Sequence, residues 1–130
     1  MIDYRLYASN DYEKVASLID AFCAETNADT DICERLKENV RTGQTRVLIA
    51  ENGIIQGIGG YIVNGENVYS EFLYVVPEKR KGLIGGTLFR LFLNDTKNCK
   101  RQYIFASPEI APKYQKSGFK VKGFILEKEA

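Results

Sequence analysis

The sequence contains no histidine among its 130 residues. A Ser-His-Asp triad, a Cys-His pair and a His-ligated zinc site are therefore excluded. A general base must be a carboxylate, a lysine, a tyrosine, a cysteine or a water held by backbone groups. The three cysteines, Cys23, Cys33 and Cys99, form no Cys-x-x-Cys pair, and their odd number argues against a disulfide framework. We expect reduced thiols that pack as small hydrophobic side chains in a cytoplasmic protein.

The sequence also lacks a long apolar run and an excess of charge of one sign. The longest apolar stretches, such as residues 72–76, are too short to cross a bilayer, and residues 1–5 do not resemble a signal peptide. We therefore expect no membrane partner. Eighteen Lys and Arg residues nearly balance 17 Asp and Glu residues, and the formal net charge of +1 argues against a nucleic-acid partner. The length suits a single domain over residues 1–130.

The hydrophobic pattern predicts an α/β domain with ten elements in the order β-α-α-β-β-β-α-β-α-β. Asn52-Gly53 and Asn64-Gly65 are hairpin turns, so the three strands that they join form an antiparallel meander. The later strand–helix–strand order predicts a parallel pair through a right-handed crossover, and hence a mixed, mostly antiparallel sheet flanked by helices. The predicted strands cover residues 2–8, 46–51, 54–63, 67–76, 102–106 and 119–126. Helices are predicted between Ser9 and Phe22 and between Asp29 and Gly43, and over residues 83–97 and 112–117.

Residues 71–88 carry the most informative chemistry. A strand ends at Pro77, and the chain then passes through Arg80, Lys81 and three glycines into the first turn of a helix. A helix start offers free N–H donors and the positive end of a dipole, and glycines let an anion approach the backbone. The segment therefore predicts a diphosphate site, although it matches neither the P-loop nor the Rossmann glycine pattern.

This segment resembles motif A of the GNAT superfamily of acetyl-CoA-dependent N-acetyltransferases, V-x-P-x-x-[RQ]-x-x-G-x-[GA]. The match runs without gaps through Val75-Val76-Pro77-Glu78-Lys79-Arg80, and Gly85 falls on the final small position. The stretch Lys113-Tyr114-Gln115-Lys116-Ser117-Gly118-Phe119 is similar to the end of the family's motif B, in which a tyrosine stands four residues before Gly-Phe. The element order agrees with the GNAT fold over the whole chain, including two parallel strands that splay apart at the cofactor site.

The resemblance implies a set of cofactor contacts. Backbone N–H groups of residues 81–86, which are Lys81, Gly82, Leu83, Ile84, Gly85 and Gly86, would hold the pyrophosphate together with Arg80. Main-chain groups of Val75 and Val76 would bind the pantetheine arm, with the Val76 N–H near the thioester oxygen. Ser107 stands where many relatives have an asparagine that contacts pantetheine, but a plain helix cap explains it equally well.

One position departs from the family pattern. The first glycine of the pyrophosphate loop is expected three residues after Arg80, where this sequence has Leu83. Its Cβ could crowd the cofactor. Alternatively, Gly82 and Gly86 take over the close approach to the phosphates.

Two side chains are candidates for acid–base catalysis. Glu71 lies on the strand before the Val-x-Pro motif, and strict alternation puts it on one face with Tyr69, Leu73 and Val75. Desolvation among apolar neighbours would suit a general base that accepts a proton from the substrate amine. The competing interpretation is a structural carboxylate paired with a nearby Lys or Arg. Tyr114 matches the family's general acid, which protonates the departing thiolate, and otherwise would be an ordinary core aromatic.

The resemblance therefore implies an acetyl-CoA-dependent N-acetyltransferase in which a primary amine attacks the thioester directly, with no metal. The acceptor is a small molecule or a protein, and the sequence does not identify it. A homodimer is allowed, because many relatives are dimers. The alternative, prompted by Leu83, is a catalytically inactive GNAT-fold module that binds a protein partner.

Overall fold

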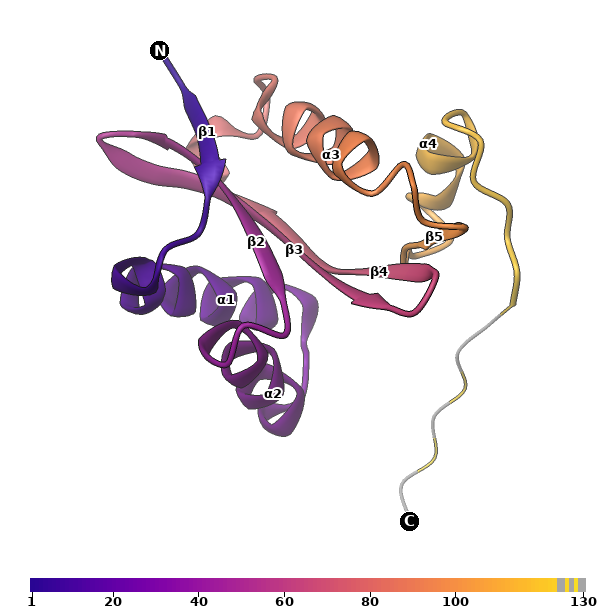
Figure 1. Cartoon of the computed structure of the whole chain (residues 1–130), viewed down its shortest axis with the longest axis horizontal. Helices are drawn as coiled ribbons and strands as arrows, with labels where there is room; N and C mark the ends of the chain where they lie inside the picture. Colours follow the sequence, from indigo (N-terminus) through magenta and orange to yellow (C-terminus); the bar gives the residue numbers. More distant parts are fainter. Residues whose placement is uncertain (124–125, 127, 129–130) are drawn as a thin grey trace.

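The structure, a computed structural model, describes residues 1–123, 126 and 128. In this part of the chain, five strands form one mixed sheet in the order β1-β2-β3-β4-β5 (Figure 1). Neighbouring strands are antiparallel from β1 to β4, and β5 pairs parallel to β4. The predicted fold class and the predicted meander are thus confirmed. Both Asn-Gly turns place their glycine at positive φ, 71° at Gly53 and 64° at Gly65, a conformation that favours glycine.

The elements have the following bounds. The strands are β1 (Asp3–Leu6), β2 (Arg46–Asn52), β3 (Ile54–Asn64), β4 (Asn67–Val75) and β5 (Arg101–Tyr103). The helices are α1 (Tyr12–Thr26), α2 (Thr30–Arg41), α3 (Ile84–Asp95) and α4 (Ala111–Gln115), with short 3-10 turns η1 (Ser9–Asp11) and η2 (Pro77–Lys79).

Two predictions for the C-terminal third are wrong. The strand predicted over residues 102–106 ends at Tyr103, and Phe105 beyond it is 65% exposed. The strand predicted over residues 119–126 is not formed at residues 119–123, while 124–125 lie outside the described residues. The reason is visible at Phe119, whose ring packs against Phe89 and Tyr114 instead of joining the sheet (centroids 5.9 and 6.2 Å apart).

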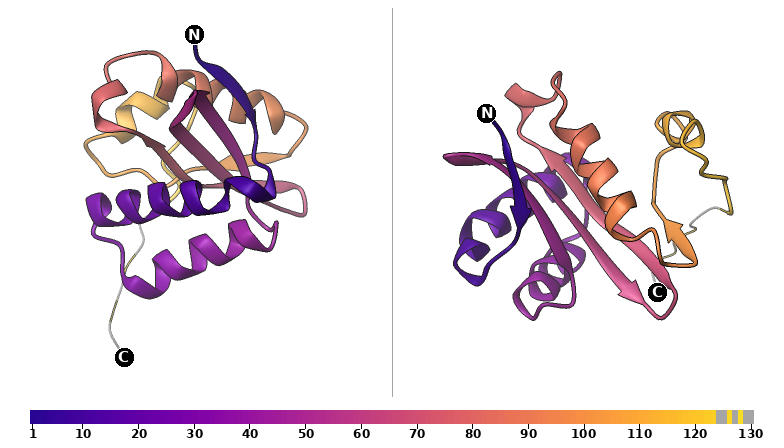
Figure 2. Two further views of the ribbon diagram at one scale, coloured as in Figure 1. Left: turned by 90° about the vertical axis from the view of Figure 1, so that its left-hand side faces the viewer. Right: turned by 45° about the horizontal axis from the view of Figure 1, so that its top comes forward.

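The sheet has a separate apolar core on each face. Helices α1 and α2 cover one face and α3 covers the other, as the views in Figures 1 and 2 show. The α1–α2 core combines helical and strand residues: Val15, Ile19, Leu36, Val40, Ile49, Ile58, Phe72 and Tyr74. The α3 core does the same: Leu48, Tyr61, Val68, Val75, Ile84, Leu88 and Phe92.

A β-bulge interrupts β4 at Glu71. Gly60 of β3 pairs with Phe72 and the next residue, Tyr61, pairs with Ser70, so Glu71 is the extra residue. Its effect is visible in the packing, because Val68 and Val75 both lie in the α3 core although strict alternation would put them on opposite faces. The prediction that Glu71 shares a face with Leu73 and Val75 is therefore wrong. Its carboxylate instead reaches Arg35 of α2.

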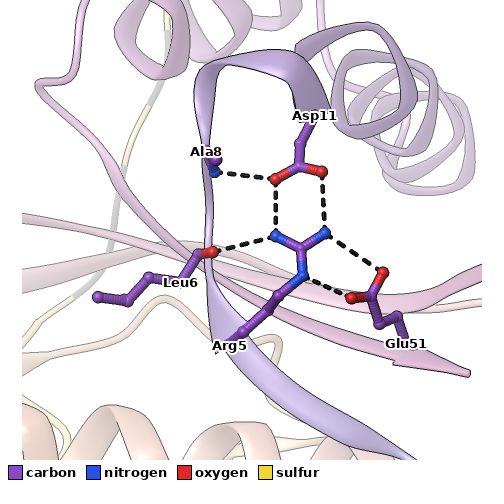
Figure 3. A network of polar contacts seen from close by, with 5 residues as sticks. All are labelled: Arg5, Leu6, Ala8, Asp11 and Glu51. Atoms are coloured by element: carbon purple, nitrogen blue, oxygen red, sulfur yellow. Dashed lines mark hydrogen bonds and ion pairs between the residues drawn. The ribbon is translucent and has the colours of Figure 1, made fainter.

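An ion-pair network fixes the N-terminal strand to the sheet (Figure 3). Arg5 of β1 donates to both carboxylate oxygens of Asp11, at 2.8 and 2.9 Å, and to Glu51 of β2 at 2.5 and 3.2 Å. Asp11 is only 7% exposed and also accepts the Ala8 N–H at 2.8 Å. The hydrogen bonds from Arg5 lower the pKa of Asp11 to about 2. The network thereby ties η1, the turn directly before α1, to the sheet.

Candidate active site

The parallel strands β4 and β5 are paired over only three residues each. Asn67, Val68 and Tyr69 face Arg101, Gln102 and Tyr103, and the rings of Tyr69 and Tyr103 stack with centroids 5.0 Å apart. Beyond this pair, β4 continues to Val75 without a partner on that side among the described residues. Apart from the Val75 carbonyl, which accepts a hydrogen bond from Arg80 Nε at 2.8 Å, the stretch from Ser70 to Val75 thus presents a free strand edge, to which an extended ligand can add by backbone hydrogen bonds.

The backbone at the end of β4 differs from the expectation at one atom. The Val76 N–H donates to the Gln56 carbonyl of β3 at 2.9 Å. It is therefore engaged and does not face the gap, which is the open space beside the free edge of β4. Successive peptide groups alternate between the two sides of a strand, so the N–H groups of Val75 and Leu73 are directed away from β3. The backbone donor that faces the gap at this level therefore belongs to Val75.

The turn after β4 leads directly into α3. The first backbone hydrogen bond of this helix joins the Thr87 N–H to the Leu83 carbonyl at 2.9 Å. The N–H groups of Ile84, Gly85 and Gly86 have no acceptor among the described residues, as expected in the first turn of a helix.

The glycines of this turn leave space around the free donors. A Cβ at Gly86 would have no neighbour within 4 Å, and a Cβ at Gly85 would lie 3.6 Å from Val75 Cγ2. Lys79 and Lys81 are exposed beside the turn. The residues present therefore fit a diphosphate, because open backbone donors and a helix dipole are combined there and two exposed lysines lie in the segment just before them.

Leu83 does not distort this turn. It is 79% exposed, so its side chain lies outside the core, and α3 begins at the very next residue. The N–H groups of Ile84, Gly85 and Gly86 are thus free although this chain has a leucine where the motif that it resembles has glycine.

Arg80, expected at the phosphates, makes its contacts elsewhere. Its Nε donates to the Val75 carbonyl at 2.8 Å, and its two terminal nitrogens donate to the Glu25 carboxylate of α1 at 2.5 and 2.7 Å. Its guanidinium carbon also lies 5.2 Å from the centre of the Tyr74 ring. The side chain therefore fastens α1 to the end of β4, and sequence reasoning missed its partner, Glu25, which no motif marks.

Glu71 lies on the free-edge stretch of β4, and its side chain is on the α2 side of the sheet. Its side chain is 13% exposed, and one carboxylate oxygen lies 3.3 Å from Arg35 Nη1. The other oxygen has no partner in the described part of the chain. The geometry thus includes both features that the sequence offered as alternatives, a shielded carboxylate and a basic partner.

Tyr114 lies on the opposite face of the sheet, beside α3. Its ring packs against Phe89 of α3 with centroids 5.1 Å apart. Burial raises the pKa of its hydroxyl, which keeps the phenol protonated at neutral pH. The hydroxyl has no hydrogen-bond partner among the residues described. A neutral O–H donor without an internal acceptor is what a general acid requires.

Ser107 begins the turn that leads to α4. Its carbonyl accepts the N–H groups of Ile110 and Ala111 at 3.0 and 2.9 Å, and its exposed side chain makes no hydrogen bond to the described residues. The hydroxyl therefore does not act as a helix cap, and α4 is preceded by Ile110.

The comparison with protein families agrees with this geometry. The model of the acetyltransferase (GNAT) domain matches residues 8–129. The chain belongs to the GNAT acetyltransferase family. It is thus an N-acetyltransferase in the general sense of that family. Comparison with curated protein sequences gives no significant match.

Solved GNAT structures share the fold at low sequence identity. A predicted acetyltransferase from Clostridium acetobutylicum, determined with acetyl-CoA, has a TM-score of 0.79 and 20% identity, over 99% of this chain and 96% of its own. Glucosamine-6-phosphate N-acetyltransferase from Arabidopsis thaliana has a TM-score of 0.74 and 15% identity, over 99% and 98%. An aminoglycoside acetyltransferase from a soil metagenome, in complex with sisomicin, has a TM-score of 0.72 and 19% identity, over 98% and 97%.

The described residues of this GNAT domain include neither a membrane-spanning helix nor a metal-binding group. None of its described helices combines the length and apolar character that crossing a bilayer requires. The same residues include no group of three or more His, Cys, Asp or Glu side chains arranged to hold a metal ion.

Proposed function

We propose that this GNAT domain transfers the acetyl group of acetyl-CoA to a primary amine by direct attack. The observation that carries the proposal is the unpaired edge of β4. It ends at the free N–H groups of α3 and has Glu71 on one face of the sheet and Tyr114 on the other. The proposal includes residues 1–130 acting as one domain in the cytoplasm, with Cys23, Cys33 and Cys99 as free thiols.

The cofactor would bind along this edge. The N–H groups of Ile84, Gly85 and Gly86 would receive the diphosphate, and the N–H and carbonyl groups of Leu73 would pair with the pantetheine arm. Ser107 would contact the arm from the opposite side of the gap. When bound, acetyl-CoA supplies the acetyl group as a reactive thioester. We assign the donor for its carbonyl oxygen to the Val75 N–H, because the Val76 N–H is engaged with Gln56.

The chain's own groups then handle the protons. Glu71 accepts a proton from the acceptor's ammonium group, which frees the nitrogen lone pair for attack on the acetyl carbon. As the new C–N bond forms and the C–S bond breaks, Tyr114 donates its proton to the sulfur. The amide nitrogen loses its remaining extra proton to solvent, and the proton held by Glu71 passes through solvent to reprotonate Tyr114. One acetyl transfer therefore releases one proton and free CoA. Base and acid on opposite faces suit a reaction in which the amine enters on one side and the thiolate leaves on the other.

No feature of the described residues favours the inactive binding module. That alternative depended on Leu83 closing the pyrophosphate loop, and the exposed leucine leaves the donors of Ile84, Gly85 and Gly86 free. A homodimer stays a prediction from the family resemblance.

The proposal is tested by measuring the release of CoA thiol over a panel of primary amines. The wild-type protein is compared with Glu71→Gln and Tyr114→Phe. Each substitution removes one proton-transfer group with little change of shape, so we expect kcat to fall by about 10²–10⁴. Folding of each variant is checked by its thermal unfolding midpoint. If the wild-type protein turns over an amine and both variants do so at the wild-type rate, these roles are wrong.

A further inference from the structure

The ion pair between Arg35 and Glu71 is unusual among the charges of α2. Its single contact is 3.3 Å long, and the arginine side chain is 55% exposed whereas the glutamate side chain is only 13% exposed. The other two cations of the helix are held by carboxylates on the surface. Lys37 lies 2.9 Å from both Asp20 and Glu34, and Arg41 pairs with Glu38 one turn earlier. Arg35 alone extends from this helix to the sheet.

The contact between Arg35 and Glu71 is of a kind that exchanges readily. A long, single hydrogen bond from a half-exposed guanidinium adds little stability and is easily replaced by another cation. A primary ammonium ion offers the same charge and three N–H donors, in a smaller group. Because the Glu71 side chain is only 13% exposed, a ligand cation competes with the guanidinium for the small part of the carboxylate that remains open.

We propose that Arg35 occupies, in the acceptor-free enzyme, the place of the acceptor's ammonium group on Glu71. This inference deepens the proposed function and depends on it for the identity of the ligand. The acceptor binds as an aliphatic ammonium ion and displaces the guanidinium before transfer. Arg35 is therefore a specificity-determining residue, which disfavours amines that bind in the uncharged form, such as aromatic amines, because these cannot compete for the carboxylate.

The first consequence concerns KM. Removing the competing cation in Arg35→Ala is expected to lower KM for an accepted aliphatic amine about two- to fivefold, the range of a half-exposed ion pair. Arg35→Lys keeps a cation within reach and is expected to retain a KM near the wild-type value. Arg41→Ala is the matched control on the same helix, because its partner is Glu38, and it is expected to leave KM unchanged. A merely structural role for Arg35 would raise KM or lower stability instead.

A binding experiment tests the same idea without acetyl transfer. Ethylammonium chloride is titrated into protein with ¹³C-labelled glutamate side chains, with sodium chloride at equal concentration as the reference. We expect the Glu71 carboxyl signal to shift with ethylammonium, and at two- to fivefold lower concentration in Arg35→Ala than in wild type or Arg41→Ala. Glu71→Gln identifies the signal by its loss.

The outcomes are separable. Tighter binding of ethylammonium in Arg35→Ala supports the proposal even if no amine is turned over, in which case the proposed function alone fails. Equal or weaker binding in Arg35→Ala, in a variant that unfolds at the wild-type temperature, overturns it. The same holds if the Glu71 signal responds to sodium chloride as strongly as to ethylammonium.

Discussion

Two neighbouring glycines of β3 give a sharp test of how Glu71 is positioned. A Cβ at Gly60 would lie less than 3.0 Å from three atoms of the Phe72 ring, and Phe72 is buried and directly follows Glu71. A Cβ at Gly59 would lie 3.6 Å from Leu73 Cδ1, an ordinary van der Waals distance. The ring of Phe72 thus fills the space of the missing Cβ at Gly60 and packs on the strand opposite the bulge.

Gly60→Ala is therefore expected to displace the Phe72 ring, and Gly59→Ala is its matched control. Overpacking a buried site of this kind costs about 2–3 kcal/mol, which lowers the midpoint of thermal unfolding by roughly 8–12 °C in a domain of this size. Gly59→Ala is expected to stay within about 2 °C of wild type, because alanine also restricts the unfolded chain. Calorimetry measures both midpoints, and CoA release measures the accompanying loss of activity in Gly60→Ala. Equal effects of the two substitutions would refute the role assigned to the Phe72 ring.

Three further predictions concern charges and protons. Asp11, with a pKa of about 2 against an ordinary value of 3.8, stabilises the fold above pH 4 by at most about 2 kcal/mol, and this contribution is lost as the pH falls through 2. In urea unfolding, Asp11→Asn should be less stable than wild type at pH 7. The stability of this variant should lack the Asp11-dependent decrease between pH 4 and pH 2. Glu25→Gln is expected to change stability little but to weaken acetyl-CoA binding about two- to fivefold, because Arg80 then no longer fixes the end of β4 at Val75 to α1; an unchanged Kd by calorimetric titration would contradict this. For Tyr114 the raised pKa predicts a basic limb of the kcat–pH profile above pH 10 that Tyr114→Phe lacks, and a limb common to both would belong to another group.

Local sequence patterns predicted the parts of the fold that local chemistry determines. The Asn-Gly pairs specify the two hairpins, because their glycines adopt positive φ in the structure. The basic, glycine-bearing turn likewise predicted free backbone N–H donors in the first turn of a helix. Tyr114 was singled out by the resemblance of residues 113–119 to the family's motif B, and its catalytic role stays a prediction.

The remaining features depend on partners that are distant in the sequence. The bulge at Glu71 accompanies the packing of Phe72 on Gly60 of β3, and no pattern within β4 predicts this bulge. It reversed the predicted face of Glu71. Arg80 pairs with Glu25, which is 55 positions away in the sequence, so the place of Arg80 in the motif did not predict this contact. The engagement of the Val76 N–H similarly follows from the register with β3.

The central claim, that acetyl-CoA binds at the free N–H groups of α3, is tested most directly by thermal unfolding with the cofactor. Saturation at about 100 times Kd should stabilise the wild-type protein by roughly 2.7 kcal/mol, or on the order of 10 °C. Gly86→Asp places a carboxylate in open space in the first turn of α3, where it is compatible with the helix dipole but repels a diphosphate. Gly86→Asn is the uncharged control of the same shape. We predict a shift in wild type and in Gly86→Asn and none in Gly86→Asp; an equal shift in all three, or none in wild type at millimolar acetyl-CoA, would contradict the account.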